Sequence, residues 1–558
     1  MKTQRMAKAT QKFKLQKNVS ILQVKEDRQK NSDNSLSSEA EKSQNDILHS
    51  EIIENESVQN EENKPASDPP ARNLRDRSKL NLPSRYKNFV LSSGNKSAVI
   101  ALISEIQDIT TLEALNDANW KKAVTEEMNS FANMGTWELI EASPDVKIYT
   151  CLWVLSKKQN GRFKARLVIR GCEQKDELDF ADVFSPVAQY TSIRLMLSLA
   201  ASNNMKIITF DIKSAYLHGD LDQVIYMYQP EGFDDGSGRI CLLKKNIYGL
   251  KKGAKNWNSK ISHYFKSIGL ENTDDDVCIY YNKDRTVIIS LFVDDGLAIG
   301  VSEEVIMDIL RGLNKEFEAT FDTEFKDSLE YLGMQIRKDQ SGIFVNQSSY
   351  TEKILKNFDF ATVNIASTPM EKGMLTREED HVNDHLLDRS IPYRQAIGSL
   401  LYLSTISRPD ISFAVNYLSR FSSKPKNSHW KMIKRVFQYL KGSIHFGIHF
   451  DGSTKLIAYT DSDYEGDLTT GQSTSGVLVL RGGPIVWYAK KQHLVATSTA
   501  EAEYRAAVCS IDDRCWIRRL EHELNFINLE EPVTLFIDNW SAIYMLKSSG
   551  EGKISKAY

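Results

Sequence analysis

The sequence predicts a multidomain protein of the α+β class, with a smaller α/β domain at the C-terminal end. Its 558 residues exceed the roughly 250–300 that one hydrophobic core usually serves. Apolar, strand-like runs flank carboxylates in the first half of the chain, and helical periodicity dominates residues 396–440. From Lys455 a new series of strand-like runs begins, which predicts the second domain.

Composition restricts the class of protein. Hydrophobic residues make up 41% of the chain and aromatic residues 9%, as in globular proteins. No apolar run approaches the roughly 18–20 residues that cross a bilayer, and no secretory signal opens the chain, so no membrane partner is expected. The six cysteines stand apart without a CxxC pair, which argues against a zinc site and for a reducing compartment. A net charge of −3 gives nucleic-acid binding no support by itself.

Residues 1–90 are expected to be a disordered tail and linker, because they lack apolar periodicity and are rich in Gln, Asn, Ser, Lys and Glu. The first 25 residues contain lysines and no acid, so a targeting or nucleic-acid-binding arm is an alternative to a solvated tail. Order is expected from about Ser97. The segment 119–128 predicts an amphipathic helix, and short strands are expected through Trp137 and Trp153.

Two apolar runs in the segment 287–300 flank a pair of adjacent carboxylates, Asp294 and Asp295. The runs predict strands, and Asp295-Gly296 predicts the tight turn of a hairpin. The preference of turns for Asp and Gly would explain Asp295 alone. Two like charges at the tip of buried strands repel each other and resist losing water, whereas a divalent cation would remove both penalties. The pair therefore predicts a metal site, which needs a third carboxylate.

Asp211 supplies that third carboxylate, because it interrupts an apolar, strand-like run at 205–212. An alternative is that Asp211 caps the turn that begins at Ser214. With Asp294 and Asp295 it could hold two metal ions that flank an in-line phosphoryl displacement. Tyr216 lies five residues further on, close enough to form a wall of the site, and core packing is the alternative.

The strand-like segment 162–171 carries alternating cations, among them Lys164 and Arg166. Cations on one face of a strand are often its solvated side. The functional interpretation is a triphosphate clamp, in which Lys and Arg bind phosphate oxygens. Pattern alone leaves both interpretations open.

These motifs together resemble the reverse transcriptase and RNase H portion of a copia-type long-terminal-repeat retrotransposon Pol polyprotein. The resemblance extends from about Pro83 to the end of the chain. The segments that carry it are Lys164–Val168, Phe184–Ala188, Asp211–Gly219, Gln229–Phe233, Tyr248–Lys251 and Phe292–Asp295.

The resemblance implies a right-hand polymerase with fingers and palm in residues 91–345 and thumb or connection helices in 346–450. An RNase H-like domain is expected in 451–558. Asp211, Asp294 and Asp295 would bind two Mg²⁺ ions, with Mn²⁺ as a substitute; one would activate the primer 3′-hydroxyl and the other would hold the dNTP. Lys164 and Arg166 look like the phosphate contacts of the fingers. Tyr216 looks like the residue that crowds the sugar 2′ position.

The chain departs from the family pattern in two places. Phe292 stands where the family usually has Tyr. The nucleotide-contacting run usually reads Leu-Lys-Gln-Ala-Pro-Arg before the Trp, whereas here Lys252 replaces the Gln and Lys255 replaces the Arg. These departures put full activity in doubt, although Lys252 is still expected to contact the nucleotide. A catalytically decayed or host-retained remnant that binds nucleic acid is therefore the alternative to an active enzyme.

Helical periodicity predicts three helices, at Ala396–Leu403, Asp410–Phe421 and His429–Leu440. The resemblance implies that they grip the template–primer phosphates, and a solvated face is the alternative for the cations of the last helix. In the last domain, strand-like runs end on Asp461 and on Asp538, and Ser498 opens a helix expected to reach about Leu524. Ser498 and Glu501 fit a capping box, which leaves Glu503 available as a ligand. Asp538 would also suit a helix N-cap.

Asp461, Glu503 and Asp538 resemble the first three acids of an RNase H site, which cleaves the RNA strand of a hybrid with two Mg²⁺ ions. The family's fourth acid would follow at about the point where the chain ends, so a C-terminally truncated and impaired nuclease is expected. By resemblance, the partners are an RNA/DNA template–primer and dNTPs, with a homodimer or particle-associated Gag as further options. A cytoplasmic virus-like particle, the nucleus or both would be the location.

Overall fold

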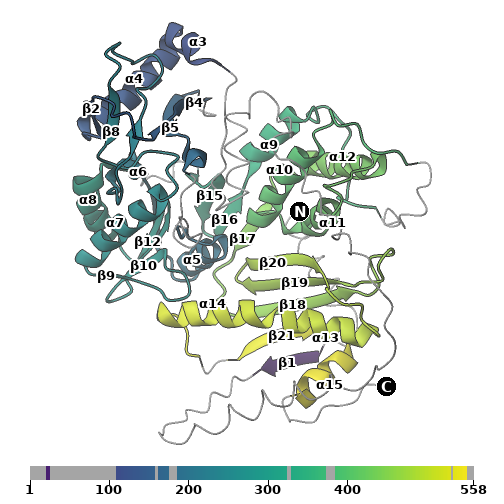
Figure 1. Cartoon of the computed structure of the whole chain (residues 1–558). Coiled ribbons are helices and arrows are strands. Elements are labelled where there is room, and N and C mark those ends of the chain that lie inside the picture. The colour runs from purple at the N-terminus through teal and green to yellow at the C-terminus, as the bar shows by residue number, and fades with distance from the viewer. Residues whose placement is uncertain are drawn as a thin grey trace, which may run out of the picture. The chain divides into compact units, whose positions relative to one another are not determined.

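The computed structural model describes residues 109–157, 161–174, 185–322, 328–371, 384–529 and 532–549, together with the backbone of Ser20–Val24. The chain divides into two units, of which Met1–Lys25 with Val90–Tyr558 form one and Glu26–Phe89 the other. Every described residue belongs to the first unit (Figure 1).

A six-stranded antiparallel sheet forms the centre of the first half. Its strand order is β13-β6-β12-β11-β10-β9, and its strands are β6 (Lys206–Ile212), β9 (Leu270–Asn272), β10 (Ile279–Asn282), β11 (Val287–Phe292), β12 (Asp295–Gly300) and β13 (Ala319–Asp322). Successive strand residues point to opposite faces. One face therefore packs on α7 (Gly253–Ser267) and α8 (Glu303–Phe317), and the other on α5 (Tyr190–Ser202).

A separate core lies around two smaller sheets that precede and follow β6 in the chain. The helices α3 (Thr111–Asn116) and α4 (Ala118–Asn133) border it (Figure 1). One sheet is the hairpin of β4 (Cys151–Lys157) and β5 (Phe163–Ile169). The other has the order β2-β8-β7-β3, with strands Trp137–Ile140, Ile240–Leu243, Tyr226–Met227 and Ile148–Tyr149. A 3₁₀ turn (Gly171–Glu173) and the short helix α6 (Ala215–His218) complete this part. The helix predicted at 119–128 is confirmed within α4.

A third sheet joins residues on both sides of the expected boundary between 345 and 346. It has the order β14-β15-β16-β17, with strands Leu329–Tyr331, Met334–Asp339, Gly342–Asn346 and Gly447–Phe450. Because β17 pairs with β16, the helical segment returns to the sheet from which it started. Its helices are α9 (Ser348–Asn357), α10 (Tyr393–Ile406), α11 (Ser412–Ser419) and α12 (Asn427–Gly442), with a 3₁₀ turn at Pro409–Ile411. The predicted helices within 396–440 are confirmed.

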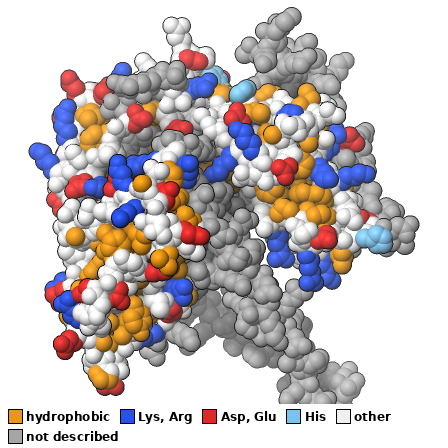
Figure 2. All heavy atoms as spheres, turned by 90° about the horizontal axis from the view of Figure 1, so that it is seen from above, with side chains coloured by type: hydrophobic (Ala, Val, Ile, Leu, Met, Phe, Trp, Pro, Cys, Tyr) orange, Lys and Arg blue, Asp and Glu red, His pale blue; other side chains and the backbone are white. Residues whose placement is uncertain are grey.

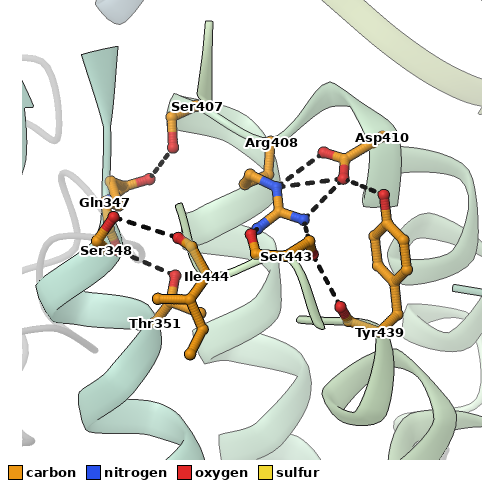
Figure 3. A network of polar contacts seen from close by, with 9 residues as sticks. All are labelled: Gln347, Ser348, Thr351, Ser407, Arg408, Asp410, Tyr439, Ser443 and Ile444. Carbon is orange, nitrogen blue, oxygen red and sulfur yellow. Dashed lines mark hydrogen bonds and ion pairs between the residues drawn. The ribbon is translucent and has the colours of Figure 1, made fainter. Parts of the chain in front are cut away.

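Arg408 connects the 3₁₀ turn at Pro409–Ile411 with the C-terminal end of α12 (Figure 3). Its guanidinium donates to both oxygens of Asp410 at 2.7–3.2 Å and to the carbonyl and hydroxyl oxygens of Ser443 at 3.0 and 2.6 Å. The Tyr439 hydroxyl donates to the same Asp410 carboxylate at 2.8 Å. Arg408 is 1% exposed, so these bonds supply the partners that a buried guanidinium requires.

The C-terminal domain is a five-stranded mixed sheet of order β1-β21-β18-β19-β20. Its strands are β18 (Leu456–Asp463), β19 (Thr474–Arg481), β20 (Pro484–Lys491) and β21 (Val533–Ile537), with helices α13 (Thr499–Cys509), α14 (Ile511–Glu523) and α15 (Trp540–Ser549). The helix predicted from Ser498 to about Leu524 is therefore two helices, which meet at Ser510. The edge strand β1 (Ser20–Val24) runs antiparallel to β21, so five residues of the segment expected to lack regular structure form a strand.

Candidate active sites

Asp211 and Asp295 are direct partners in the antiparallel pair of β6 and β12. Directly opposed residues of such a pair point to the same face of the sheet. On β6, Ile207 belongs to the same alternating set as Asp211, and on β12 Leu297 belongs to that of Asp295; both apolar side chains join the core that includes α5. The two carboxylates therefore lie on the α5 face, at the end of the sheet.

Asp294 lies in the hairpin turn itself. Phe292 pairs with Asp295, so the turn consists of Val293 and Asp294, and Val293 has a positive φ of 62°. The prediction of a turn at Asp295-Gly296 is wrong by two residues. Two contacts fix the turn, because the Trp257 indole N–H donates to the Val293 carbonyl at 2.7 Å and the Ile212 amide donates to the Asp294 carbonyl at 2.9 Å.

Gly296 has a different role from the predicted turn residue. A Cβ atom added at Gly296 would lie 2.0 Å from Cζ of Phe210, its partner on β6. The buried Phe210 ring therefore occupies the space above Gly296, and a larger residue there would displace it. The glycine is required by a close approach between strands rather than by turn geometry.

The charges around Asp294 are of both signs. Burial, followed by the negative charge of Asp211, raises its pKa, while Lys164 and Arg166 act to lower it. The two cations on β5 thus lie near enough to Asp294 to favour its ionised form. Lys164 and Arg166 are half-buried, so they do not form the freely solvated side of the strand.

Two tyrosines line the same region. The rings of Tyr216 and Tyr248 are 4.9 Å apart, and the Arg166 guanidinium lies 5.7 Å from the centroid of the Tyr248 ring. Burial, together with the charge of Asp294, raises the pKa of Tyr216 to about 12, so its hydroxyl stays protonated at neutral pH. Tyr216 therefore lies near enough to Asp294 for the charge of Asp294 to act on it, and its role as a wall of the site stays a prediction.

Two other predicted residues have defined contacts. The first turn of α6 has no side-chain cap, so the alternative role of Asp211 as its cap is wrong. Lys252 precedes α7 and forms an ion pair with Asp222 at 2.8 Å. This pairing gives the ammonium group an internal partner, and its contact with a nucleotide stays a prediction.

A second group of carboxylates lies in the C-terminal domain, where Asp461 is on β18, Glu503 is on α13 and Asp538 follows β21. One ligand atom from each lies within 4.8 Å of the others. Among the described residues this is the one group of three such side chains that converges so closely; Asp211, Asp294 and Asp295 do not form a group this tight.

Glu503 is the buried member of the second group, at 6% exposed. The amide and hydroxyl of Ser462 donate to its Oε1 at 2.9 and 3.0 Å, while its buried Oε2 has no hydrogen-bond partner. Burial raises the pKa of Glu503 to about 7, and the charges of Asp461 and Asp538 add to this rise. An unsatisfied buried oxygen facing two further carboxylates fits a bound cation.

The helix caps leave these acids available. Ser498 caps α13 by accepting from the Glu501 amide at 3.2 Å, as predicted. The reciprocal half of the predicted capping box is wrong, because the Glu501 carboxylate accepts from the amide and hydroxyl of Thr497 rather than from the Ser498 amide. The expected alternative role of Asp538 as an N-cap is wrong, because Asn539 accepts from the Ala542 amide at 2.9 Å. The segment after which the family's fourth acid would follow lies outside the described residues.

Sequence reasoning missed several supporting residues. Trp257, Tyr248 and Ser462 act through contacts between distant segments, which leave no local pattern. Glu127 had a visible signal, because it falls on the apolar face of α4 at helical spacing from the buried Val124 and Phe131.

Residues 134–372 match the family model described as reverse transcriptase (RNA-dependent DNA polymerase). The chain is 36% identical over 449 residues to the retrovirus-related Pol polyprotein from transposon TNT 1-94 of Nicotiana tabacum, covering 77% of this chain and 33% of that protein. It is 34% identical to the corresponding polyprotein from transposon RE2 of Arabidopsis thaliana, covering 83% and 32%. The chain thus spans about a third of the length of these curated relatives.

A solved structure of a foamy viral protease-reverse transcriptase in complex with double-stranded DNA aligns with a TM-score of 0.46 and 11% identity, covering 78% of this chain and 69% of that one. Within the described residues, no helix combines the length and apolar character needed to cross a membrane. The right-hand polymerase class expected for the first part of the chain is confirmed by the family match, while the RNase H-like class of the C-terminal domain stays a prediction. The chain therefore belongs to the reverse transcriptases found in the Pol polyproteins of copia-type retrotransposons.

Proposed function

We propose that the chain is an RNA-directed DNA polymerase, which extends a primer on a nucleic-acid template with dNTPs. The observation that supports this most directly is the placement of Asp211 and Asp295 opposite each other on one sheet face, with Asp294 in the adjoining turn. The match of residues 134–372 to the reverse transcriptase family supports the same chemistry.

The three aspartates would hold two divalent cations, Mg²⁺ in the first place with Mn²⁺ as a substitute. Burial and the charge of Asp211 raise the pKa of Asp294. The raised pKa reflects the free-energy cost of bringing unneutralised carboxylates together, and a bound cation would remove that cost. When bound, the cations would lower the pKa of the primer hydroxyl and neutralise charge on the reacting phosphates. The three carboxylates would determine where the positive charge of the cations lies.

The side chains around the aspartates suit the incoming nucleotide. Lys164 and Arg166 offer cationic donors for triphosphate oxygens, and they already act on the charge of Asp294. The paired rings of Tyr216 and Tyr248 form an aromatic wall on which the sugar and base would lie. Tyr216 would thereby limit the room at the sugar 2′ position.

Contacts to the template–primer would come from exposed cations such as Lys431 and Lys434 on α12. The neighbouring Arg435 pairs with Glu371, so it is held by the protein itself. On the face drawn in Figure 2, Lys and Arg side chains are interspersed with acidic and hydrophobic ones. Binding would therefore depend on individual phosphate contacts rather than on a uniformly basic surface.

A second, residual activity is proposed for the C-terminal domain, namely weak hydrolysis of the RNA strand of a hybrid. The convergence of Asp461, Glu503 and Asp538 within 4.8 Å and the unpartnered Oε2 of Glu503 support it. The same cation chemistry would apply, with water as the nucleophile.

Primer extension on poly(rA)/oligo(dT) with Mg²⁺ tests the first activity. Asp294→Asn should reduce extension at least about a hundredfold, because the metal site supplies several kcal/mol to the transition state. The matched control is Asp308→Asn on α8, whose carboxylate is 74% exposed. Hybrid cleavage by wild type and by Asp461→Asn tests the second activity separately.

A decayed or host-retained remnant is the alternative function, and the Lys252–Asp222 ion pair favours it in so far as it withdraws a cation from the nucleotide. A wild-type chain that binds template–primer but extends no better than Asp294→Asn would support the remnant. Association with a second copy or with Gag, and location in a cytoplasmic virus-like particle or the nucleus, stay proposals from the family relationship.

A further inference from the structure

Asp276 is a buried carboxylate in the segment that joins β9 to β10. The residue is 5% exposed, so the protein must supply donors in place of water. Its Oδ1 accepts from the Cys278 amide at 3.1 Å, and its carbonyl accepts from the Thr273 hydroxyl at 2.7 Å. One carboxylate oxygen is thus used within its own turn, which leaves the other for a different element.

The second oxygen of Asp276 binds the start of α5. Its Oδ2 accepts from the Gln189 amide at 3.0 Å and from the Ser192 hydroxyl at 2.5 Å. Gln189 is the N-cap residue of α5, and its own side chain makes no capping bond. In a capping box, a side chain at the third helical position binds the N-cap amide. Ser192 stands at that position, but Asp276, 87 positions after Gln189, supplies the acceptor.

The first turn of α5 lies against the end of β11. The Ala188 amide donates to the Leu291 carbonyl at 3.1 Å, and the rings of Tyr190 and Phe292 are 6.1 Å apart. Phe292 is in turn the direct partner of Asp295 in the pair of β11 and β12. The start of α5 therefore contacts the strand end next to one of the three aspartates.

A closed ring of hydrogen bonds connects these parts. The Leu291 amide donates to the Cys278 carbonyl at 2.9 Å, which joins β11 to the turn of Asp276. Ala188 joins β11 to Gln189, and Gln189 returns to Asp276. The other members of the ring contribute backbone atoms. Asp276 is therefore the position at which a side-chain substitution can interrupt the ring.

We propose that Asp276 is a positioning residue, which holds the first turn of α5 against the end of β11 and thereby sets where Asp295 lies in the polymerase metal site. The inference rests on the proposed polymerase function. Asp295 lies on the sheet face that α5 covers, so a displaced first turn would change the packing beside its carboxylate. Asp276 acts through Tyr190 and Phe292 and does not itself bind the cation.

The primary measurement is Mn²⁺ binding, followed by electron paramagnetic resonance of the free ion, because it does not require catalysis. All chains carry Asp461→Asn to disable the second metal site, and the polymerase site is defined as the binding that Asp294→Asn abolishes. Asp276→Asn should raise the Kd of this site about fivefold, which corresponds to about 1 kcal/mol of hydrogen-bond free energy. In primer extension it should also raise the Mg²⁺ concentration that gives half the maximal rate.

Asp275→Asn is the matched control. Asp275 is the adjacent residue in the same turn, and its carboxylate pairs with Arg519 on α14 at 2.8 Å rather than with α5. Its Mn²⁺ Kd should equal that of the chain with Asp461→Asn alone. Amide hydrogen exchange at Ala188 should accelerate in Asp276→Asn and stay unchanged in Asp275→Asn.

A second substitution separates positioning from simple helix capping. Gln189→Ser places a good N-cap residue at the start of α5, which can accept from an amide of its own helix. Asp276→Asn/Gln189→Ser should therefore recover the Tm that Asp276→Asn loses. A local cap does not attach α5 to the segment between β9 and β10, so the Mn²⁺ Kd should stay raised in the double variant.

Three results would overturn the inference: an unchanged Mn²⁺ Kd in Asp276→Asn, an equal rise in Asp275→Asn, or recovery of Kd together with Tm in the double variant. If Asp276→Asn does not fold, Ser192→Ala takes its place, because it removes one of the two contacts to α5; a smaller rise in Kd is expected, and no rise would overturn the inference. Mn²⁺ binding that depends on Asp294, without primer extension by wild type, would refute the polymerase proposal alone. Absence of such binding would refute both.

Discussion

The ring of Phe210 on β6 lies over Gly296 on β12, immediately beside the opposed pair Asp211 and Asp295. Phe210 is 3% exposed, and it packs on the face of the sheet covered by α7 and α8. The carboxylates occupy the opposite face. Core packing on one side of the two strands therefore sets the separation and register of the acids on the other.

Gly296→Ala should destabilise the chain and impair primer extension together. The added Cβ would lie 2.0 Å from Phe210 Cζ, so the ring must move and the β6–β12 pairing must adjust. Overpacking of this kind costs about 1–3 kcal/mol, measurable as a lower urea midpoint. Gly476→Ala on β19 is the control, because the nearest atom to its Cβ is 3.7 Å away. Recovery in the Phe210→Leu/Gly296→Ala double variant is expected, and an unchanged midpoint for Gly296→Ala alone would contradict the explanation.

Glu503 should make the metal-free protein less stable as pH rises. Burial raises its pKa to about 7 in the folded chain, whereas an unfolded Glu has a pKa of about 4.3. Between these values the folded chain holds a proton that the unfolded chain has lost, so the free energy of unfolding falls with increasing pH and stays lower above pH 7. Glu503→Gln should therefore raise Tm relative to wild type at pH 8 in EDTA, but not at pH 4. A higher Tm only at the acidic end would reverse the assigned direction.

Addition of Mn²⁺ or Mg²⁺ should reverse the loss of stability that ionised Glu503 causes at high pH. At pH 8 the metal-induced rise in Tm should be larger for wild type than for Glu503→Gln, because binding to the folded state stabilises it. Glu501→Gln on the same helix is the control: it weakens the helix start by losing contacts to Thr497, yet should keep the full metal-induced rise. Equal rises in all three proteins would remove Glu503 from the metal site.

Asp211, Asp294, Asp461 and Asp538 stand out in the sequence because each one ends or interrupts an apolar run, which is a local pattern, whereas Glu503 is assigned by the resemblance. The helices within 396–440 could be predicted for the same reason. The turn at Val293-Asp294 could not, because Asp295-Gly296 is a stronger local turn signal and Gly296 is needed instead by Phe210, more than 80 positions earlier in the chain. The sequence shows a glycine in either case, so it does not distinguish a turn residue from one that a close contact between strands requires.

Other errors have equally specific causes. Ser510 separates α13 from α14, and its hydroxyl donates to the Ala507 carbonyl at 2.7 Å; the continuous helical periodicity around it concealed the break. Asp538 and Asn539 are both good N-caps, and only the contact from the Ala542 amide distinguishes them. Pairing of Ser20–Val24 with β21 joins segments too distant for any local pattern.

The buried ion pair of Arg481 and Glu521 should be important for stability. Each side chain is 1% exposed, and Arg481 also donates to the hydroxyls of Ser198 and Ser202 on α5 at 3.0 and 3.1 Å. Arg481→Met leaves a buried carboxylate without its cation, which costs about 3–5 kcal/mol. The urea midpoint should fall accordingly, and Arg481→Met/Glu521→Leu should recover much of the loss.

The exposed ion pair of Arg311 and Asp308 provides the comparison, since its side chains are 63% and 74% exposed. Arg311→Met should change the free energy of unfolding by no more than about 1 kcal/mol, because water solvates the remaining carboxylate. Similar losses for Arg311→Met and Arg481→Met would show that burial does not control the cost.

Arg408→Lys should loosen the helical segment even though it conserves charge. The guanidinium binds Asp410 through two nitrogens and Ser443 through two oxygens, whereas an ammonium group cannot span these positions in one plane. An unsatisfied Ser443, which is 4% exposed, would cost about 1–3 kcal/mol, and amide hydrogen exchange should accelerate at the C-terminal end of α12, where Ser443 lies (Figure 3). Arg394→Lys is the control, because Arg394 is exposed and its Nε makes one bond, to the Ser422 carbonyl at 2.7 Å; its cost should stay within about 0.5 kcal/mol. If both substitutions leave exchange in α12 unchanged, the forked geometry of Arg408 does not hold the helix ends together.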